Sequence, residues 1–255
     1  MDKISIGCSI KSYKRKKAYQ KLNPINIENL QYPEYLDKDY WNDLQYLRAL
    51  NKKIVLDGPY IDLNPGASEI SIQKLTYEKV IEAVRYGIVV NADEIVFLST
   101  FLPFIGLKSY EKKWIEKSKK FWRAILIESG GMIRISICNT FEFIPDHLID
   151  IVESIGHRNF GLAMDVGHIL IWGKISFLEW YRKTNPYVNT IYLHSNNGKA
   201  DQHKSILTGK LSGNTELYEL LHEIAHSTEK RIFLKYLSHR NILSDIEFLE
   251  KSLKK

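Results

Sequence analysis

Polar residues that can bind a metal or transfer a proton follow two apolar segments in the second half of the chain. The segment GLAMDVGH ends in Asp165 and His168, and YLHSNNGKADQH ends in Asp201 and His203. Residues two apart in an extended stretch point the same way, so Asp201 and His203 are expected to face together. With His168 they form a set of two imidazoles and one carboxylate. Such a set suffices for one divalent metal, zinc or manganese, with an open position for water or substrate.

The same residues have a second interpretation that needs no metal. Taken alone, Asp165 can cap the turn that follows it, and a single histidine near a strand end is more often a hydrogen-bonded neighbour than a ligand. Their occurrence at the ends of two successive segments favours a site. Hydrogen bonds to the hydroxyls of a substrate would use these side chains equally well, and His194 and Asn196 are expected to take part in such binding. Both interpretations stay open at this stage.

A series of alternating strands and helices must position these residues. Short β-branched runs alternate with longer stretches whose apolar residues recur at helical spacing, which is typical of βα units around a parallel sheet. The clearest helical stripe lies in 217–225, and similar stripes lie in 80–88, 114–126 and 148–155, with a weaker one in 13–22. Eight strands are expected, at 4–9, 25–30, 53–57, 94–98, 132–138, 160–165, 190–194 and 231–236.

The longer irregular segments all follow strands, whereas the turns from helix to strand are short. A barrel with long connections on its carboxyl-terminal side has its binding site on that side. No linker, repeat or low-complexity tract interrupts the series. The sequence therefore predicts an α/β fold, a single (β/α)8 TIM barrel over residues 1–255, with its chemistry at the carboxyl-terminal mouth. The irregular segments are 58–72, 99–108, 139–145, 166–175 and 195–213.

Composition and charge limit the classes of partner. The formal net charge of +6 permits an anionic partner but does not require one. The densest basic cluster, in 11–17, follows the first expected strand, and a solvated face is favoured over a phosphate-binding segment. We therefore expect a small-molecule substrate, phosphorylated or not, rather than a nucleic acid. No nucleotide cofactor is expected.

Cysteine and hydropathy patterns predict a cytoplasmic protein that does not enter a membrane. Cys8 and Cys138 both fall inside apolar runs expected to be strands, which argues against a disulfide scaffold and against a paired-cysteine metal site. A reducing compartment is the default. The amino-terminal segment becomes charged after about ten residues, too early for a signal peptide. No apolar run approaches the roughly 18 residues that span a bilayer.

Five segments resemble, in order and spacing, the motifs of one known group of proteins. LDGPYIDLNPGA (56–67) resembles H-x-P-Y…N, ADEIVFLS (92–99) resembles G-A-D-x-V-V-x-H, and ISICNTFE (135–142) resembles I-x-I-E-N. GLAMDVGH (161–168) resembles L-x-L-D-x-G-H, and 192–211 resembles H-L-x-D-N-x-G-x-x-D-x-H-x-x-x-G-x-G-x-I. These motifs belong to the sugar phosphate isomerase/epimerase and apurinic-site endonuclease (family 2) group. The resemblance covers most of the chain and implies a xylose isomerase-like TIM barrel.

The resemblance also implies metal-ligand positions, and five of them are altered here. Asp57, Leu98 and Tyr192 stand where the family pattern has histidines at the ends of the third, fourth and seventh strands. Cys138 and Lys235 stand where it has glutamates on the fifth and eighth strands. A leucine cannot bind a metal, and a lysine brings positive charge into the space of a cation. A full cluster of three metals is therefore not expected.

Other family positions are retained. Of the ligands around the isomerase-type single metal, the resemblance keeps Asp165. His168, Asp201 and His203 match one of the three zinc sites of the endonucleases. A single metal held by these three is consistent with the resemblance, because an open catalytic zinc normally has three protein ligands. Hydrogen bonding to substrate hydroxyls remains the alternative.

Lys235 admits two interpretations. Its ammonium group can stand in for the missing cation and polarise a carbonyl, or hold a carboxylate or phosphate, near Asp165 and Asp57. Alternatively, a Lys–Asp ion pair fills the former metal space, and this simpler interpretation is favoured. Glu142 offers a carboxylate from a loop. The expected catalytic residues are Asp165, Lys235 and Glu142, and the expected substrate-binding residues are Asp57, Tyr192, His194 and Asn196.

Three hypotheses about function follow. The first is an isomerase, epimerase or lyase that acts on a sugar or a related polyhydroxylated molecule by proton transfer next to a carbonyl. The second is a degenerate, non-catalytic barrel that binds a ligand. The third is phosphodiester cleavage at abasic sites in DNA, against which the five altered ligands count strongly. We take the first as the main hypothesis.

Overall fold

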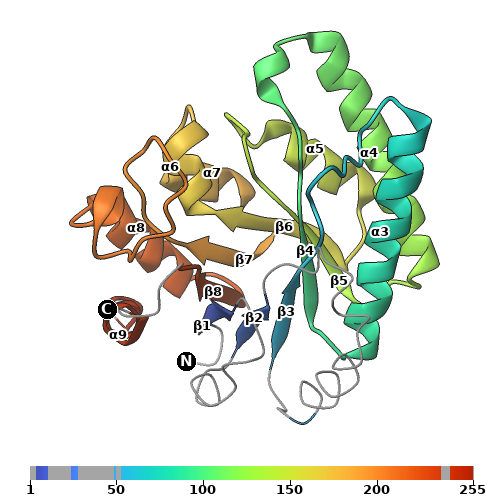
Figure 1. The fold of residues 1–255 in the computed structure, drawn as a ribbon. Coiled ribbons are helices and arrows are strands. Elements are labelled where there is room, and N and C mark those ends of the chain that lie inside the picture. The colour runs from blue at the N-terminus through green and yellow to red at the C-terminus, as the bar shows by residue number, and fades with distance from the viewer. Residues whose placement is uncertain (1–3, 11–23, 28–48, 50–52, 237–241, 255) are drawn as a thin grey trace.

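The computed structural model describes residues 4–10, 24–27, 49, 53–236 and 242–254. Within them, eight parallel strands follow one another around a closed barrel, and the first strand pairs with the last (Figure 1). The expected TIM barrel is thereby confirmed. The strands are β1 (Ile4–Ile10), β2 (Ile25–Ile27), β3 (Ile54–Asp57), β4 (Glu94–Leu98), β5 (Arg134–Cys138), β6 (Phe160–Asp165), β7 (Val188–Leu193) and β8 (Lys230–Leu234).

Helices pack around the outside of the barrel (Figure 1). Their apolar stripes face inward as the spacing predicts, and in the stripe at 217–225 Leu217, Leu220, Leu221 and Ile224 are all buried. None of the helices in the described ranges is both long and apolar enough to cross a membrane. The helices are α3 (Ile70–Val89), α4 (Lys108–Glu128), α5 (Asp146–Ile155), α6 (Val166–Trp172), α7 (Phe177–Thr184), α8 (Thr215–Ala225) and α9 (Ile242–Ser252).

Two short helices lie where the spacing predicts none. α6 occupies most of 166–175, which is expected to be irregular, and α7 follows it. Each begins at a capping side chain: Asp165 accepts a hydrogen bond from the backbone N–H of His168 at 3.0 Å, and Ser176 accepts one from that of Glu179 at 3.2 Å. Helices of seven and eight residues are too short for an apolar period to stand out.

Some predictions concern boundaries or segments that the structure does not describe. α3 begins at Ile70, inside the expected irregular segment 58–72. β7 begins at Val188, two residues before its expected start. The expected helix in 13–22 and the basic cluster in 11–17 lie outside the described residues.

Apolar layers lie on both sides of the sheet. The outer one, between strands and helices, includes Trp114, Trp122 and Trp180, each at most 1% exposed. The inner one fills the middle of the barrel and places a packed floor under the carboxyl-terminal mouth. Its buried members are Val55, Val96, Cys138, Ala163, Tyr192 and Phe233.

A polar layer lies below this floor, toward the amino-terminal ends of the strands. Glu94, fully buried at the start of β4, is its centre. Its carboxylate accepts hydrogen bonds from Ser136, from Thr190 at 2.6 Å and from the guanidinium of Arg231 at 2.8 Å. Arg134 lies 3.9 Å from the same carboxylate. These contacts join β4, β5, β7 and β8 at the amino-terminal end.

Candidate functional site

The carboxyl-terminal ends of β3, β4, β7 and β8 surround a cavity of about 190 Å³. Most of the site residues predicted from the sequence meet in its wall, next to the apolar side chains of Val96 and Leu98 from β4. Its lining in the described residues is Asp57, Gly58, Tyr60, Val96, Leu98, His168, Tyr192, Asp201, His203 and Lys235. Two groups of polar residues face each other here. The imidazole corner comprises Asp165, His168, His194, Asp201 and His203, and the lysine corner comprises Asp57, Tyr192 and Lys235.

Asp201 joins two histidines of the imidazole corner. Its Oδ2 lies 3.0 Å from Nε2 of His203 and 3.5 Å from Nε2 of His168. The other ring nitrogen of each histidine meets a backbone carbonyl: Nδ1 of His168 lies 2.8 Å from the oxygen of Asn139, and Nδ1 of His203 lies 2.8 Å from that of Lys235. Each carbonyl accepts a hydrogen bond from Nδ1–H, and Nε2 of both rings faces Asp201. The structure thus brings together the predicted set of His168, Asp201 and His203.

The backbone of His203 is held in an unusual conformation. Its φ angle is +46°, in the left-handed region that residues with a side chain seldom adopt. Two contacts fix the ring at this position, one to Asp201 and one to the carbonyl of Lys235. Backbone strain of this kind is concentrated at functional sites.

Asp165 is buried behind this wall, at the end of β6. Its Oδ1 lies 2.9 Å from Nε2 of His194. Its backbone N–H donates to Oδ1 of Asn139 at 2.8 Å, and its carbonyl accepts from Nδ2 of Asn139 at 3.0 Å. The predicted catalytic carboxylate therefore orients imidazoles and lies outside the cavity lining.

His194, which the sequence analysis assigns to substrate binding, lies at the centre of the imidazole corner. Its ring stacks on that of His203 with centroids 4.0 Å apart. Its buried Nδ1 has no hydrogen-bond partner among the described residues and lies 3.7 Å from Oδ1 of Asp201. Gly167 permits this position, because a Cβ there would lie 2.0 Å from the His194 ring.

Two overlapping sets of side chains in this corner can hold a metal. In each set, one ligand atom per residue lies within 4.8 Å of the others, and both sets contain His194. The buried nitrogen of His194 that lacks a partner supports this fit, because a metal would satisfy it. The sets are Asp165, His168 and His194, and His194, Asp201 and His203.

Opposite charges control the pKa values in this corner. Burial alone would raise the pKa of Asp165, but His168 and His194 hold it well below its usual range. Burial alone would lower the pKa of His168, but the carboxylates of Asp165 and Asp201 raise it to about 9. Burial lowers the pKa of His194 despite its contact with Asp165. In the absence of a metal, His168 is therefore a cation beside two carboxylates.

The lysine corner lies across the cavity. Nζ of Lys235 lies 2.8 Å from Oδ2 of Asp57 and 4.2 Å from the centroid of the Tyr192 ring. The Tyr192 hydroxyl donates to Oδ1 of Asp57 at 2.6 Å, and Nδ2 of Asn26 donates to the same oxygen at 2.9 Å. Burial and Asp57 raise the pKa of Tyr192 well above its ordinary value. The Lys–Asp ion pair is thus present, and both partners remain on the cavity wall.

Two other predicted residues lie outside the cavity lining of the described chain. The carboxylate of Glu142 is buried, accepts hydrogen bonds from Ser99 and from the backbone of Thr140, and lies 3.6 Å from Nε2 of His147. Asn196 is fully buried, and its side chain holds the backbone of Gly167 and Gly198. Both support the loops around the mouth.

Comparisons with known proteins agree with the fold. The model of a family described as xylose isomerase-like TIM barrel matches residues 27–251. The uncharacterised protein MJ1311 of Methanocaldococcus jannaschii is 25% identical over 224 residues, which cover 82% of this chain and 75% of that protein.

Two solved structures have the same overall shape. A D-tagatose 3-epimerase-like protein superposes with a TM-score of 0.79 at 22% identity, over 98% of this chain and 97% of the other. D-psicose 3-epimerase from Clostridium cellulolyticum H10, solved with D-tagatose, superposes with a TM-score of 0.77 at 13% identity, over 98% and 99% of the two chains.

Proposed function

The chain belongs to the xylose isomerase-like TIM barrel family, and from this membership we propose that it isomerises or epimerises a sugar or a related polyhydroxylated small molecule. The observation that carries the proposal is the shared cavity, which has a carboxylate paired with a lysine on one side and imidazoles with a second carboxylate on the other. Proton transfer next to a carbonyl needs a base for the proton and a cation or donor for the oxygen.

The lysine corner supplies both of these groups. The carboxylate of Asp57 takes the proton from the carbon next to the carbonyl, and the electron pair of the C–H bond moves toward the carbonyl oxygen. The ammonium of Lys235, 2.8 Å from Asp57, stabilises the negative charge on that oxygen. Delivery of a proton to the opposite face by the protonated His168, across the cavity, gives the epimer. Return of the proton from Asp57 to the neighbouring carbon, with a proton shifted from the hydroxyl to the former carbonyl oxygen, gives the isomer.

The imidazole corner binds the substrate and can hold one divalent metal, zinc or manganese. His168, Asp201 and His203 reach the cavity, and Asp165 and His194 orient them from behind. A bound metal would act as a Lewis acid toward substrate oxygens. The side chains themselves position the hydroxyls and hold the reacting carbon near Asp57. A phosphorylated sugar is a suitable substrate, because Lys235 and either the bound metal or, without a metal, the protonated His168 would place positive charge on the wall.

Deuterium exchange tests the proposal. The protein is incubated in heavy water with a panel of ketoses and their phosphates, with zinc or manganese, and NMR detects loss of a C–H proton. Asp57→Asn should slow exchange about 10²–10⁴-fold, the usual contribution of a general base. Lys199→Met, which changes an exposed lysine near the mouth, should leave exchange intact. Absence of exchange with every sugar would refute the proposal.

Metal analysis tests the second part of the proposal. Protein purified without chelator should contain zinc or manganese, and His203→Ala should contain one equivalent less. Equal metal content in the two proteins would contradict metal binding by His168, Asp201 and His203.

One observation favours a second candidate, a barrel that binds a sugar without converting it to a product. The Lys235 ammonium is already paired with Asp57, and Tyr192 completes that pair. Saturable binding of a sugar without deuterium exchange would support this candidate and contradict the first.

A further inference from the structure

A second group of metal-binding side chains lies on the outer ring of helices, away from the barrel mouth. The sequence HEIAH, residues 222–226, has the pattern H-E-x-x-H, whose histidines share one face of a helix and can bind the same metal. We propose that His222 and His226 form a binding site for a divalent transition metal such as zinc. This site is independent of the function proposed for the mouth.

The positions of the two rings favour a shared ligand. His222 lies in the last turn of α8, and His226 is its C-cap. Their ring centroids are 4.5 Å apart, and both side chains are exposed. Nδ1 of His226 lies 2.8 Å from the carbonyl oxygen of His222. This contact favours the Nδ1–H tautomer, which leaves the Nε2 lone pair of His226 for a metal.

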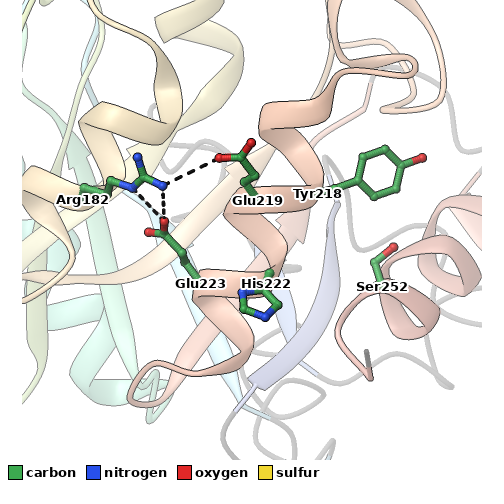
Figure 2. Close-up of a pocket in the computed structure, with 6 residues that line it drawn as sticks. All are labelled: Arg182, Tyr218, Glu219, His222, Glu223 and Ser252. Atoms are coloured by element: carbon green, nitrogen blue, oxygen red, sulfur yellow. Dashed lines mark hydrogen bonds and ion pairs between the residues drawn. The ribbon is translucent and has the colours of Figure 1, made fainter.

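The surroundings favour a cation and leave room for its remaining ligands. A cavity of about 470 Å³ lies beside His222 and is lined by Arg182, Tyr218, Glu219, Glu223 and Ser252 (Figure 2). Figure 2 shows Glu219, His222 and Glu223 along α8, with Arg182 reaching toward them from α7. The carboxyl end of a helix carries partial negative charge, which favours a cation at His222 and His226. Imidazole ligands favour zinc, copper or nickel over magnesium or calcium.

The ion pairs between Arg182 and the glutamates limit the chemistry that this site can carry out. In hydrolases with the H-E-x-x-H pattern, the glutamate acts as the general base. Here the carboxylate of Glu223 lies 2.6 and 2.7 Å from two nitrogens of Arg182. The Glu219 carboxylate lies 3.7 Å from the same guanidinium. Because Arg182 engages Glu223, the proposal is a binding site and not a peptidase site.

Zinc titration of a variant without the mouth ligands tests the proposal. The double variant His168→Gln/His203→Gln should still bind one equivalent of zinc in isothermal titration calorimetry. Adding His226→Gln should abolish that binding, whereas adding His157→Gln, a change to an exposed histidine elsewhere, should not. Absence of zinc binding by the double variant, or equal binding in both triple variants, would overturn the proposal.

A second measurement keeps the ligands of the mouth unchanged, so that it can be made even if the double variant does not fold. Equilibrium dialysis of the full chain against zinc should give one equivalent less for His226→Gln than for the unaltered protein. His157→Gln should match the unaltered protein. Equal stoichiometry in all three would overturn the site on α8, whatever the mouth binds.

Discussion

Asn139 contacts two members of the imidazole corner, Asp165 and His168. Its amide side chain holds the backbone N–H and carbonyl of Asp165 at 2.8 and 3.0 Å, and its own carbonyl meets Nδ1 of His168 at 2.8 Å. It follows the buried end of β5, so these contacts fix β5 against β6 at the mouth. Partners of this kind orient metal ligands without touching the metal.

We expect Asn139→Ala to weaken metal binding at the mouth about 10–100-fold, the usual effect of losing such a partner. Loss of the buried hydrogen bonds should also lower the free energy of unfolding by about 1–3 kcal/mol. Metal titration and urea unfolding measure the two effects. Asn159→Ala, which removes a hydrogen bond to Gly131, should leave the metal affinity unchanged. An unchanged affinity in Asn139→Ala would show that Asp165 needs no such support.

Lys230 gives a prediction about pH. Its side chain is buried at the start of β8 and donates to the carbonyls of Val188 at 2.7 Å and Asn185 at 3.1 Å. Burial, together with the charge of Arg134, lowers the pKa of Lys230 from 10.5 to about 8. Between these values the unfolded chain binds more protons than the folded one, so this residue makes stability rise with pH.

The measurement compares Lys230→Met with the unaltered protein. Thermal unfolding is measured between about pH 8 and 10. The contribution of Lys230, which makes stability rise with pH, should be present in the unaltered protein and absent from Lys230→Met, because methionine does not titrate. Parallel curves for the two proteins over this window would show that the pKa of Lys230 is not lowered by folding.

At this scale, residue types and spacing predicted part of the site. Asp165, His168, Asp201 and His203 stand out because ligand types follow two successive strands. The contact of His194 with Asp165 depends on how β6 and β7 are aligned, and no spacing in the sequence shows that alignment. Asn139 lies in the segment ISICNTFE, but its role needs three contacts, to Asp165 and His168, that only the fold brings together.

At the scale of elements, α9 is attached to the segment that carries Asp201 and His203. Asp245 of α9 is buried and accepts hydrogen bonds from Tyr236 and, at 3.0 Å, from Oγ of Ser205. The Tyr236 hydroxyl in turn accepts from the backbone N–H of Ile206 at 2.9 Å. Burial and Asp245 raise the pKa of Tyr236 far above its ordinary range. The last helix therefore stabilises the loop between β7 and α8.

We expect Asp245→Ala to remove the carboxylate that accepts from the hydroxyls of Tyr236 and Ser205, at a cost of about 1–3 kcal/mol for each buried hydrogen bond left unmade. Hydrogen exchange at the amide of Ile206 should become faster than at amides of the barrel strands, because this loop then opens locally. Glu247→Ala, which removes an exposed partner of Lys251 on the same helix, is the control. Equal hydrogen-exchange rates at Ile206 in the two variants would contradict the stabilisation of this loop by Asp245.

The sequence predicts the long elements well and the short ones poorly. Strands β4 and β6 have the expected bounds, and α3, α4, α5 and α8 follow from apolar stripes that repeat over several turns. The first residues of α6 and α7 depend on capping by Asp165 and Ser176, a local hydrogen bond that apolar periodicity does not report.

At the scale of the whole molecule, Glu94 ties the barrel together at its amino-terminal end. Two arginines, Arg231 and Arg134, face this one buried carboxylate. Glu94→Gln would remove the buried carboxylate that both arginines face. We expect the free energy of unfolding to fall by about 3–5 kcal/mol, the usual result of removing one partner from a buried ion pair. Urea unfolding measures the loss.

A matched control is Glu128→Gln, which breaks the ion pair with the largely exposed Arg85 on the helix layer. That change should cost no more than about 1 kcal/mol. Equal losses for the two variants would show that the polar layer contributes no more than a surface pair. The alternation of strands and helices predicted the barrel, but it did not predict this layer, because Glu94 looks like an ordinary polar residue before an apolar strand.

The link between His203 and residue 235 has a consequence for protein engineering. His203 is oriented by the backbone carbonyl of Lys235, 2.8 Å from its Nδ1. Any residue placed at 235 keeps that carbonyl, so the side chain there is free to change while the histidine keeps its tautomer and direction. Position 235 is therefore a place where a designer can introduce new chemistry, such as Lys235→Glu, while the carbonyl that orients His203 is kept.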